Sequence, residues 1–208
     1  GKELARSLLI NQGGHRPVTL VGYSFGARII YSCLKELAQY QQKWEEYQLE
    51  KNAPDSDKTK NKKKELEFDR EPASIVEDVI LMGLPKYLNL AVWKECRQVV
   101  AGRLVNVYSR KDKILSLMFK YKRILGSFQP VCGTCTVAVP GVENVYVTDL
   151  VSSHQDYCYL TGEILNRVRH GQPVRSESSA MDEVALLKEA EKLAKEQEES
   201  KDEQEDSK

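Results

Sequence analysis

The fold is decided by the stretch Val18-Thr19-Leu20-Val21-Gly22-Tyr23-Ser24-Phe25-Gly26-Ala27-Arg28-Ile29-Ile30. It begins as an apolar run rich in β-branched residues, which is typical of a buried strand. It then forms the pattern G-x-S-x-G with Gly22, Ser24 and Gly26. A helical pattern follows at once, so the serine lies at a turn from strand to helix.

In that context the pattern predicts the nucleophile elbow of an α/β-hydrolase, with Ser24 as the nucleophile. We expect a strained backbone at Ser24, and we expect Gly22 and Gly26 to remove Cβ atoms that would otherwise collide. The Phe25 N–H begins the helix and is expected to point to where an oxyanion would form. As a bare pattern G-x-S-x-G also arises by chance, and the strand and helix around it are what favour the elbow.

The rest of the chain alternates predicted strands and helices. This alternation is typical of a parallel sheet covered by helices, an α/β fold. The predicted strands are 75–85, closed by a Gly/Pro break, 103–109 and 142–148, and the predicted helices are 2–10, 91–100, 114–125 and 155–169.

Three histidines are candidates for a catalytic base. His15 precedes the serine strand in a connecting loop, and His170 ends the last predicted helix, where a positive charge suits the helix terminus. His154 follows the last predicted strand, as the base of an α/β-hydrolase does. A histidine in such a loop is often an ordinary surface residue, but beside the elbow we predict His154 as the general base.

The acid that orients the histidine is predicted to be Asp112. The order along the chain in this fold is serine, acid, histidine, and Asp112 follows the strand between Ser24 and His154. Asp112 also suits a helix N-cap, and the two roles are compatible. Asp78 lies inside a strand pattern and Asp149 shares the segment of His154, so both are weaker candidates.

A family resemblance rests on several blocks in order: R-P-V-T-L-V-G-Y-S-F-G-A-R at 16–28, L-M-G-L-P at 81–85, G-R-L-V-N-V-Y-S at 102–109, V-E-N-V at 142–145 and S-H at 153–154. These blocks resemble the transmembrane and coiled-coil domain-containing protein 4 family, which consists of eukaryotic membrane proteins with an α/β-hydrolase domain. The resemblance implies a serine-hydrolase site, upstream membrane-spanning helices, and a domain that faces the cytosol. It also implies that this chain is the C-terminal half of a hydrolase fold, whose earlier strands supply a second oxyanion donor.

The leading functional hypothesis is a serine hydrolase of esterase or lipase type that acts on an acyl ester through Ser24, Asp112 and His154. Neither a metal nor an organic cofactor is expected for this chemistry. A lipid substrate follows only by analogy with membrane-bound relatives. The alternative is a non-catalytic hydrolase-like scaffold for membrane trafficking or protein partners, since some relatives resemble adaptor-binding proteins.

The hydrolase domain is predicted to span residues 1–175. Two segments are predicted to lie outside its core. Residues 50–72 form a charged insert that is predicted to be disordered, in which Lys62–Lys64 is a solvated loop or a signal for anionic lipid or localisation. Residues 176–208 form a linker and an acidic, weakly helical tail, with eleven acidic residues and five lysines in 181–208. This tail is a candidate site for an unknown protein partner.

Composition and short motifs limit the other kinds of site and cellular setting that the sequence could indicate. The number of cysteines is odd and they are scattered, which suits a reducing compartment. Cys132 and Cys135 form one C-x-x-C, for which we favour a loop or short strand with two thiols over a zinc or redox site. The helix 114–125 is predicted to cover the sheet rather than to lie on an anionic membrane. No stretch predicts a transmembrane helix or a nucleic-acid interface.

Overall fold

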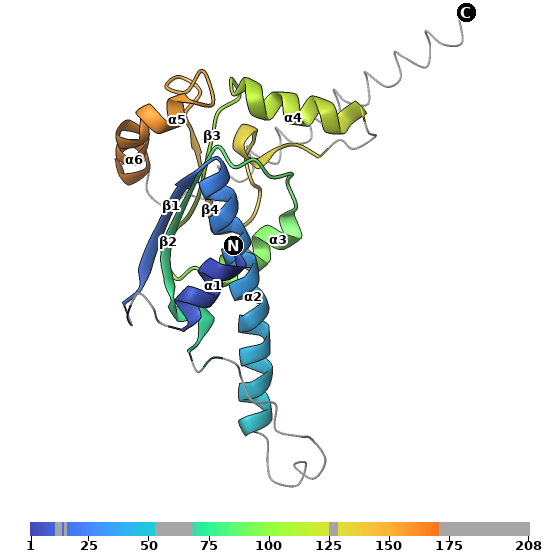
Figure 1. Cartoon of the computed structure of the whole chain (residues 1–208), viewed down its shortest axis with the longest axis vertical. Coiled ribbons are helices and arrows are strands. Elements are labelled where there is room, and N and C mark those ends of the chain that lie inside the picture. The colour runs from blue at the N-terminus through green and yellow to red at the C-terminus, as the bar shows by residue number, and fades with distance from the viewer. Residues whose placement is uncertain (11–13, 15, 53–67, 69, 125–128, 171–208) are drawn as a thin grey trace, which may run out of the picture. The chain divides into compact units, whose positions relative to one another are not determined.

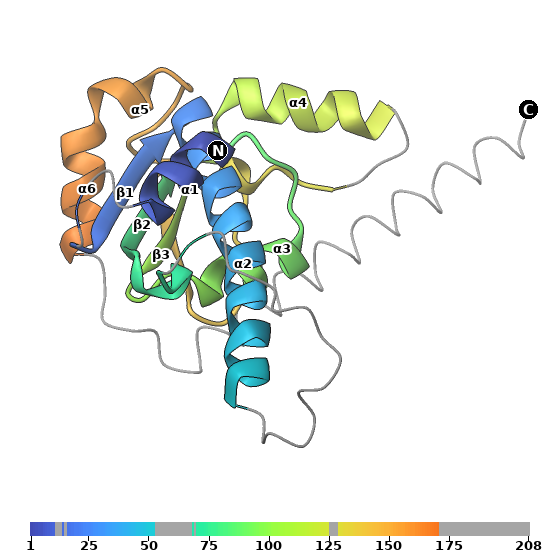
Figure 2. The ribbon, with the colours of Figure 1, turned by 60° about the horizontal axis from the view of Figure 1, so that its bottom comes forward.

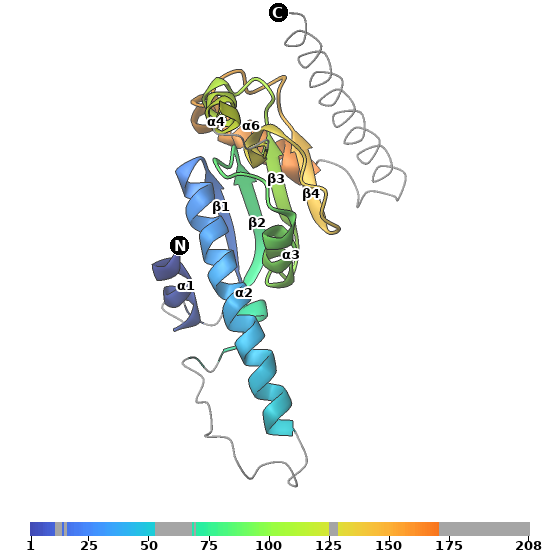
Figure 3. The ribbon, with the colours of Figure 1, turned by 90° about the vertical axis from the view of Figure 1, so that its right-hand side faces the viewer.

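The computed structural model describes residues 1–10, 14, 16–52, 68, 70–124 and 129–170. Contacts divide the chain into two units, Gly1–Arg169 and His170–Lys208. The first unit contains a sheet of four parallel strands, which Figure 3 shows side by side. In order across the sheet they are β1 (Val18–Tyr23), β2 (Val76–Met82), β3 (Leu104–Tyr108) and β4 (Val142–Tyr146).

Helices cover both faces of this sheet, which confirms the predicted α/β class. Figure 2 shows α6 on one side of the strands and α1, α2 and α3 on the other. The α-helices are α1 (Lys2–Leu9), α2 (Phe25–Asn52), α3 (Leu90–Gln98), α4 (Lys113–Ile124), α5 (Asp156–Tyr159) and α6 (Thr161–His170). Two single turns of 3-10 helix, η2 (Pro72–Ser74) and η3 (Cys132–Thr134), lie in the connections.

The side-chain alternation of the strands divides the core into two layers. On β2, Val79 and Leu81 belong to the cluster that packs on α1, α2 and α3, and it includes Trp93. Met82 belongs to the opposite cluster with Tyr157 and the α6 residues Ile164 and Val168. Because successive residues of a strand point to opposite faces, one strand supplies both layers.

Helix α2 is longer than the sheet that it covers. Its buried positions, from Ala27 through Leu34 and Leu37 to Gln41, recur at helical spacing, and none of residues 42–51 is buried. Figure 1 shows its second half extending past the sheet. The first three residues of the predicted insert, 50–52, are therefore the end of this helix.

The far end of the predicted insert also packs against the domain. The ring of Phe68 lies 5.2 Å from that of Tyr40, and Pro72 is buried in η2. Residues 53–67 and 69, with Lys62–Lys64, lie outside the described residues, as do the predicted linker and tail at 176–208.

The predicted helix 155–169 is wrong in one respect, because it is divided into α5 and α6 at Leu160. The Thr161 hydroxyl explains the break. It donates to the Tyr157 carbonyl at 2.6 Å and lies 3.2 Å from that of Cys158. A threonine hydroxyl that takes backbone carbonyls competes with the helical ladder and bends the chain.

The expectation that residues 114–125 cover the sheet is also wrong. Figure 1 shows α4 beyond the end of the sheet, where α5 also lies. Leu115 is buried, whereas Ile114 and Leu117 are 52% and 66% exposed. The helix is held in place by the Tyr87 hydroxyl, which donates to the Met118 carbonyl.

Among the helices that the structure describes, none has both the length and the apolar character of a membrane span.

Two asparagines on neighbouring strands fix the segment that leads into β4. The Asn144 side chain accepts from the Val137 N–H at 2.7 Å and donates to its carbonyl at 3.1 Å. The Asn106 amide donates to Asn144 Oδ1 and to the Cys135 carbonyl. Side chains of this kind replace the ladder bonds that a chain without regular structure lacks.

We therefore predict that Asn144→Ala lowers the free energy of unfolding by about 2 kcal/mol, because the Val137 N–H loses its acceptor and the Val137 carbonyl keeps only the Val139 N–H as donor. The exposed strand residue Thr19 supplies the control, and Thr19→Ala is expected to change stability by less than about 0.5 kcal/mol. Urea unfolding of the two variants measures the difference. Equal midpoints would contradict the role of the asparagine pair.

Candidate active site

The turn between β1 and α2 holds Ser24 in an unusual conformation. Its φ is 51°, in the left-handed region that a residue with a Cβ rarely adopts. The Ser24 N–H donates to the Met82 carbonyl at 2.9 Å, and the Ser24 carbonyl accepts from the Arg28 N–H at 3.0 Å. These two bonds hold the strained residue between the end of β2 and the first turn of α2.

The two glycines of the motif differ in their surroundings. A Cβ on Gly22 would lie 2.7 Å from Ile30 Cδ1 and 2.8 Å from the Gly26 backbone carbon, so a larger residue does not fit there. At Gly26 the expected collision is wrong, because an added Cβ would meet no atom within 4 Å in the part of the chain that the structure describes. The tight turn therefore needs its first glycine for a close backbone approach.

Asp112 lies in the connection from β3 to α4 and has no exposed surface. Its Oδ1 accepts from the Leu115 N–H at 3.0 Å, so it caps the first turn of α4, as its position in the sequence indicated. Its Oδ2 lies 2.6 Å from His154 Nδ1. A buried carboxylate needs such partners because it has lost its water.

His154 joins the serine to the acid. Its Nδ1 faces Asp112, and its Nε2 lies 2.6 Å from Ser24 Oγ. With an ionised carboxylate as acceptor, Nδ1 carries the proton and Nε2 is left free to accept from the hydroxyl. The structure thus brings together the three residues that the sequence singled out, which lie up to 130 positions apart.

Side chains that the sequence analysis missed hold the two loops of this site together. Ser109 Oγ donates to the Val151 carbonyl at 2.6 Å and accepts from the Lys111 N–H at 3.2 Å. Thr148 Oγ1 accepts from the Arg110 N–H at 2.9 Å. Both hydroxyl residues are the last residues of predicted strands, 103–109 and 142–148, which is the one signal that could have identified them.

The turn before His154 is fixed by Asp156. Its carboxylate accepts from the N–H groups of Ser152 and Ser153, both at 2.8 Å, and from the Ser153 hydroxyl. The bond from the Ser153 hydroxyl, with the two from the backbone, lowers the pKa of Asp156 below its usual range. An ionised Asp156 therefore keeps the backbone of the histidine loop closed.

Tyr157 supports the imidazole from behind. Its buried ring meets that of His154 at 6.0 Å and 73°. Gly83, with φ of 54°, makes room for it, since a Cβ there would lie 2.6 Å from the tyrosine ring. Burial is the main cause that raises the pKa of Tyr157, and the negative charge of Asp112 raises it further, so this phenol stays neutral.

The weaker candidates lie apart from this arrangement. Asp149 pairs with Arg167 through two bonds of 2.6 and 2.7 Å, and this guanidinium lowers the pKa of Asp149 to about 2. Asp78 accepts from the Arg103 N–H, just before β3 begins. His15 and the side chain of His170 lie outside the described residues.

The C-x-x-C begins in the 3-10 turn η3 rather than in a loop or strand. Burial raises the pKa of Cys132 to about 11 and that of Cys135 to about 12, so both are neutral thiols near pH 7. Among the described residues, no group of three or more His, Cys, Asp and Glu is arranged to hold a metal ion.

The parallel sheet, the strand-to-helix turn at Ser24 and the loops that follow β3 and β4 define a chain with an α/β-hydrolase type of fold. The chain belongs to the family described as "Protein of unknown function (DUF726)", whose model matches residues 1–50 and 64–171. No solved structure matches it.

Three curated relatives illustrate this family. The Oryza sativa protein named transmembrane and coiled-coil domain-containing protein STS1 is 38% identical over 81% of this chain and 21% of its own length. The Saccharomyces cerevisiae protein named probable lipase MIL1 is 35% identical over 81% of this chain and 13% of its own. An uncharacterized membrane protein of Schizosaccharomyces pombe is 35% identical over 79% and 23%. This chain spans less than a quarter of the length of each.

The unequal glycines give a matched pair of variants. Gly22→Ala is expected to lower the free energy of unfolding by about 2 kcal/mol, because its Cβ meets backbone atoms that cannot move freely. Gly26→Ala is expected to stay within about 1 kcal/mol of wild type, since alanine is favoured over glycine inside a helix. Thermal unfolding compares them, and an equal loss in both would contradict the geometry of the turn.

The five cysteines are expected to react unequally with iodoacetamide near neutral pH. Burial raises the pKa of Cys33 and Cys96 to about 12, so they share the inert state of Cys132 and Cys135. Cys158 is exposed and is expected to be alkylated at least about a hundredfold faster. Mass spectrometry of the peptides measures each rate, and fast modification of Cys132 or Cys135 would instead indicate a reactive pair.

Proposed function

We propose that this chain carries the active site of a serine hydrolase that cleaves acyl esters. The observation that supports this most directly is the continuous hydrogen-bonded chain from Ser24 Oγ through His154 to the buried Asp112. The three groups have the chemistry and the order that an activated serine requires. The strained backbone at Ser24 adds support, because such strain is common where a nucleophile must be presented.

In the proposed reaction Ser24 Oγ attacks the acyl carbon while His154 Nε2 takes the hydroxyl proton. Asp112 keeps the imidazole in one tautomer and stabilises its cationic form. As the tetrahedral intermediate collapses, the ester C–O bond breaks and the leaving alkoxide takes the proton from His154. Water then attacks the acyl-serine ester and gives a proton to His154 Nε2. As the second intermediate collapses, the bond from the acyl carbon to Ser24 Oγ breaks, His154 returns the proton to Ser24 Oγ, and the acid is released.

The oxyanion of both tetrahedral intermediates is assigned to the Phe25 N–H. Phe25 is the first residue of α2, and a helix leaves its first N–H groups without acceptors inside the helix. The positive end of the helix dipole lies at the same place. A donor that is already in position stabilises the developing charge without rearrangement.

The relatives favour a lipid ester and a membrane setting for this chemistry. One is named a probable lipase and others are named membrane or transmembrane proteins. We propose that the protein acts at a membrane to which it is attached by segments outside this chain, with this domain on the cytosolic side. We also propose that, within its family, this chain belongs with the transmembrane and coiled-coil domain-containing protein 4 group that its sequence blocks resemble.

A fluorophosphonate probe tests the proposal on the full-length protein. Wild type is expected to be labelled at Ser24, whereas Ser24→Ala and His154→Ala are expected to lose labelling, because one removes the nucleophile and the other its base. Asp112→Asn is expected to slow labelling by about a hundredfold or more. The label is located by mass spectrometry and its rate is read from gel fluorescence.

Asp149→Asn is the matched control, because Asp149 also follows a strand but pairs with Arg167. It is expected to be labelled within about threefold of the wild-type rate. A folded wild-type protein that takes no label would overturn the enzymatic proposal and favour the non-catalytic scaffold.

A further inference from the structure

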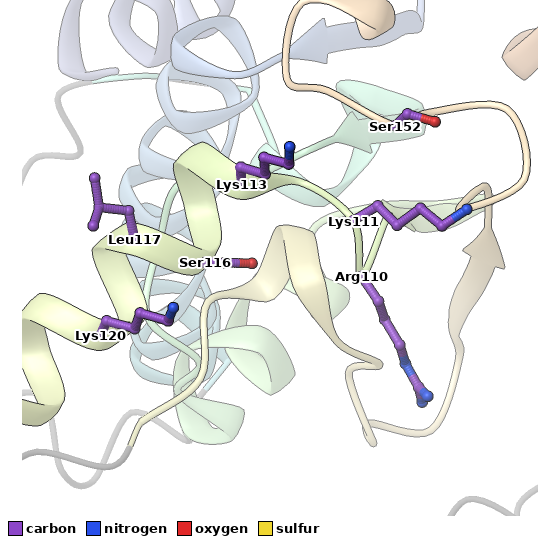
Figure 4. A pocket seen from close by; sticks show the side chains of 7 residues that line it. All are labelled: Arg110, Lys111, Lys113, Ser116, Leu117, Lys120 and Ser152. Atoms are coloured by element: carbon purple, nitrogen blue, oxygen red, sulfur yellow. The ribbon is translucent and has the colours of Figure 1, made fainter.

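A pocket of about 710 Å³ lies beside the loops that carry Asp112 and His154. Its walls come from the connection between β3 and α4, from the first two turns of α4, and from the turn that follows β4, as Figure 4 shows. We call it the basic pocket; its lining residues are Arg110, Lys111, Lys113, Ser116, Leu117, Lys120 and Ser152.

The charge of the basic pocket is not neutralised by ion pairs within the part of the chain that the structure describes. Its four cationic side chains form no ion pair with any carboxylate of the described residues. Helix α4 has no acidic residue. The carboxylates of the neighbouring loops have other partners: Asp112 has His154, Asp149 has Arg167, and Asp156 has the N–H groups of Ser152 and Ser153.

Like charges that gather in one place repel one another, and a bound anion would relieve that repulsion. A concave cluster of one sign also concentrates the field and attracts an oppositely charged ligand. Lys113 and Lys120 are seven residues apart on α4, so they lie on one face with Ser116 and Leu117 between them. Two ammonium groups and a hydroxyl on one face match the donors that a phosphate needs.

The same helix also presents apolar surface. Ile114 and Leu117 are 52% and 66% exposed, and Leu117 lines the basic pocket beside the lysines. Exposed apolar side chains next to basic ones are the pattern that binds amphiphiles with an anionic head. A hydrophilic anion such as free phosphate would have no use for this apolar part.

The basic pocket is built from the same two segments that carry Asp112 and His154. Lys111 and Lys113 flank Asp112 in the chain, and Ser152 comes two residues before His154. Only the imidazole of His154 separates Asp112 from Ser24 Oγ. A headgroup in the basic pocket would therefore lie next to the two segments that carry Asp112 and His154, and the ester of the same molecule would extend from there toward Ser24.

We propose that the basic pocket binds the phosphate of the headgroup, so that the substrate is an acyl ester of a glycerophosphate rather than a neutral lipid. This inference rests on the proposed hydrolase function and names its substrate class. Lys113 and Lys120 would contact the phosphate, and Leu117 would contact the adjoining apolar part of the lipid.

Two substrates that differ only in the phosphate test this on the full-length protein: 1-acylglycerol 3-phosphate and the 1-acylglycerol with the same chain. Wild type is expected to show the lower KM for the phosphorylated ester. The double variant Lys113→Ala/Lys120→Ala is expected to raise that KM about tenfold or more. The preference for the phosphorylated ester over 1-acylglycerol is therefore expected to be lost, and fluorophosphonate labelling of the same variant reports separately whether Ser24 is still reactive.

The control is Lys35→Ala/Lys94→Ala, which removes two exposed helix lysines from α2 and α3. It is expected to leave both KM values unchanged. If wild type hydrolyses both esters and the pocket variant alters neither KM, the headgroup assignment is overturned while the hydrolase function stands. If wild type takes no label and cleaves neither ester, the proposed function fails. The basic pocket is then tested as an anion site by the binding measurement that follows.

The binding measurement uses dodecyl phosphate below its micellar concentration, with inorganic phosphate as the second ligand. Dodecyl phosphate is expected to bind wild type and the control variant alike, and the Lys113/Lys120 variant at least about tenfold more weakly. Equal binding to all three proteins would overturn the pocket as an anion site. Inorganic phosphate that binds as tightly as dodecyl phosphate would assign the pocket to a free anion and overturn the lipid assignment.

Discussion

Parallel pairing of the strands is the constraint on which the rest of the molecule depends. Since β1, β2, β3 and β4 run in one direction, the segments that leave them start from one edge of the sheet. Ser24, Asp112 and His154 each lie in a segment that follows a strand, and they meet there although 130 positions separate the first from the last. The register aligns Tyr108 with Tyr146, so the two loops that begin there lie beside each other. Ser109 and Thr148 then tie those loops together by hydrogen bonds to the partner loop.

Several local costs are concentrated at this edge. Ser24 has a left-handed backbone, Asp112 is buried, and Tyr157 is packed against Gly83. A buried carboxylate is tolerated because the Leu115 N–H and His154 replace its water. A fold that served only as a scaffold would gain stability by replacing these groups with apolar ones. The hydrogen-bonded unit of Ser24, His154 and Asp112 therefore favours the proposed chemistry over packing alone.

The sequence was sufficient for the features that depend on local patterns and on chain order. Apolar runs that alternate with helical patterns located the four strands. Asp112 was selected because it directly follows a predicted strand of its own, whereas Asp78 lies inside a strand pattern and Asp149 shares the segment of His154. The tertiary contacts could not be obtained in this way. The space at Gly26, the packing of Tyr157 on His154 and the place of α4 beyond the sheet depend on residues distant in sequence. The break between α5 and α6 depends on one hydrogen bond from the Thr161 hydroxyl, and helix propensity alone does not predict whether that bond forms.

The basic pocket and the residues Asp112 and His154 are carried by the same two loops, and this links binding to chemistry in the proposed enzyme. Lys111 and Lys113 are held by the same connection that positions Asp112, and the turn closed by Asp156 carries both Ser152 and His154. An anion in the pocket would relieve the repulsion among its cations and thereby stabilise both loops in the observed geometry. Binding energy from a phosphate that does not react would then be used to keep His154 aligned with Ser24. An ester without the phosphate would leave that energy unused, so selectivity for the headgroup would arise from the fold itself and not from the acyl chain.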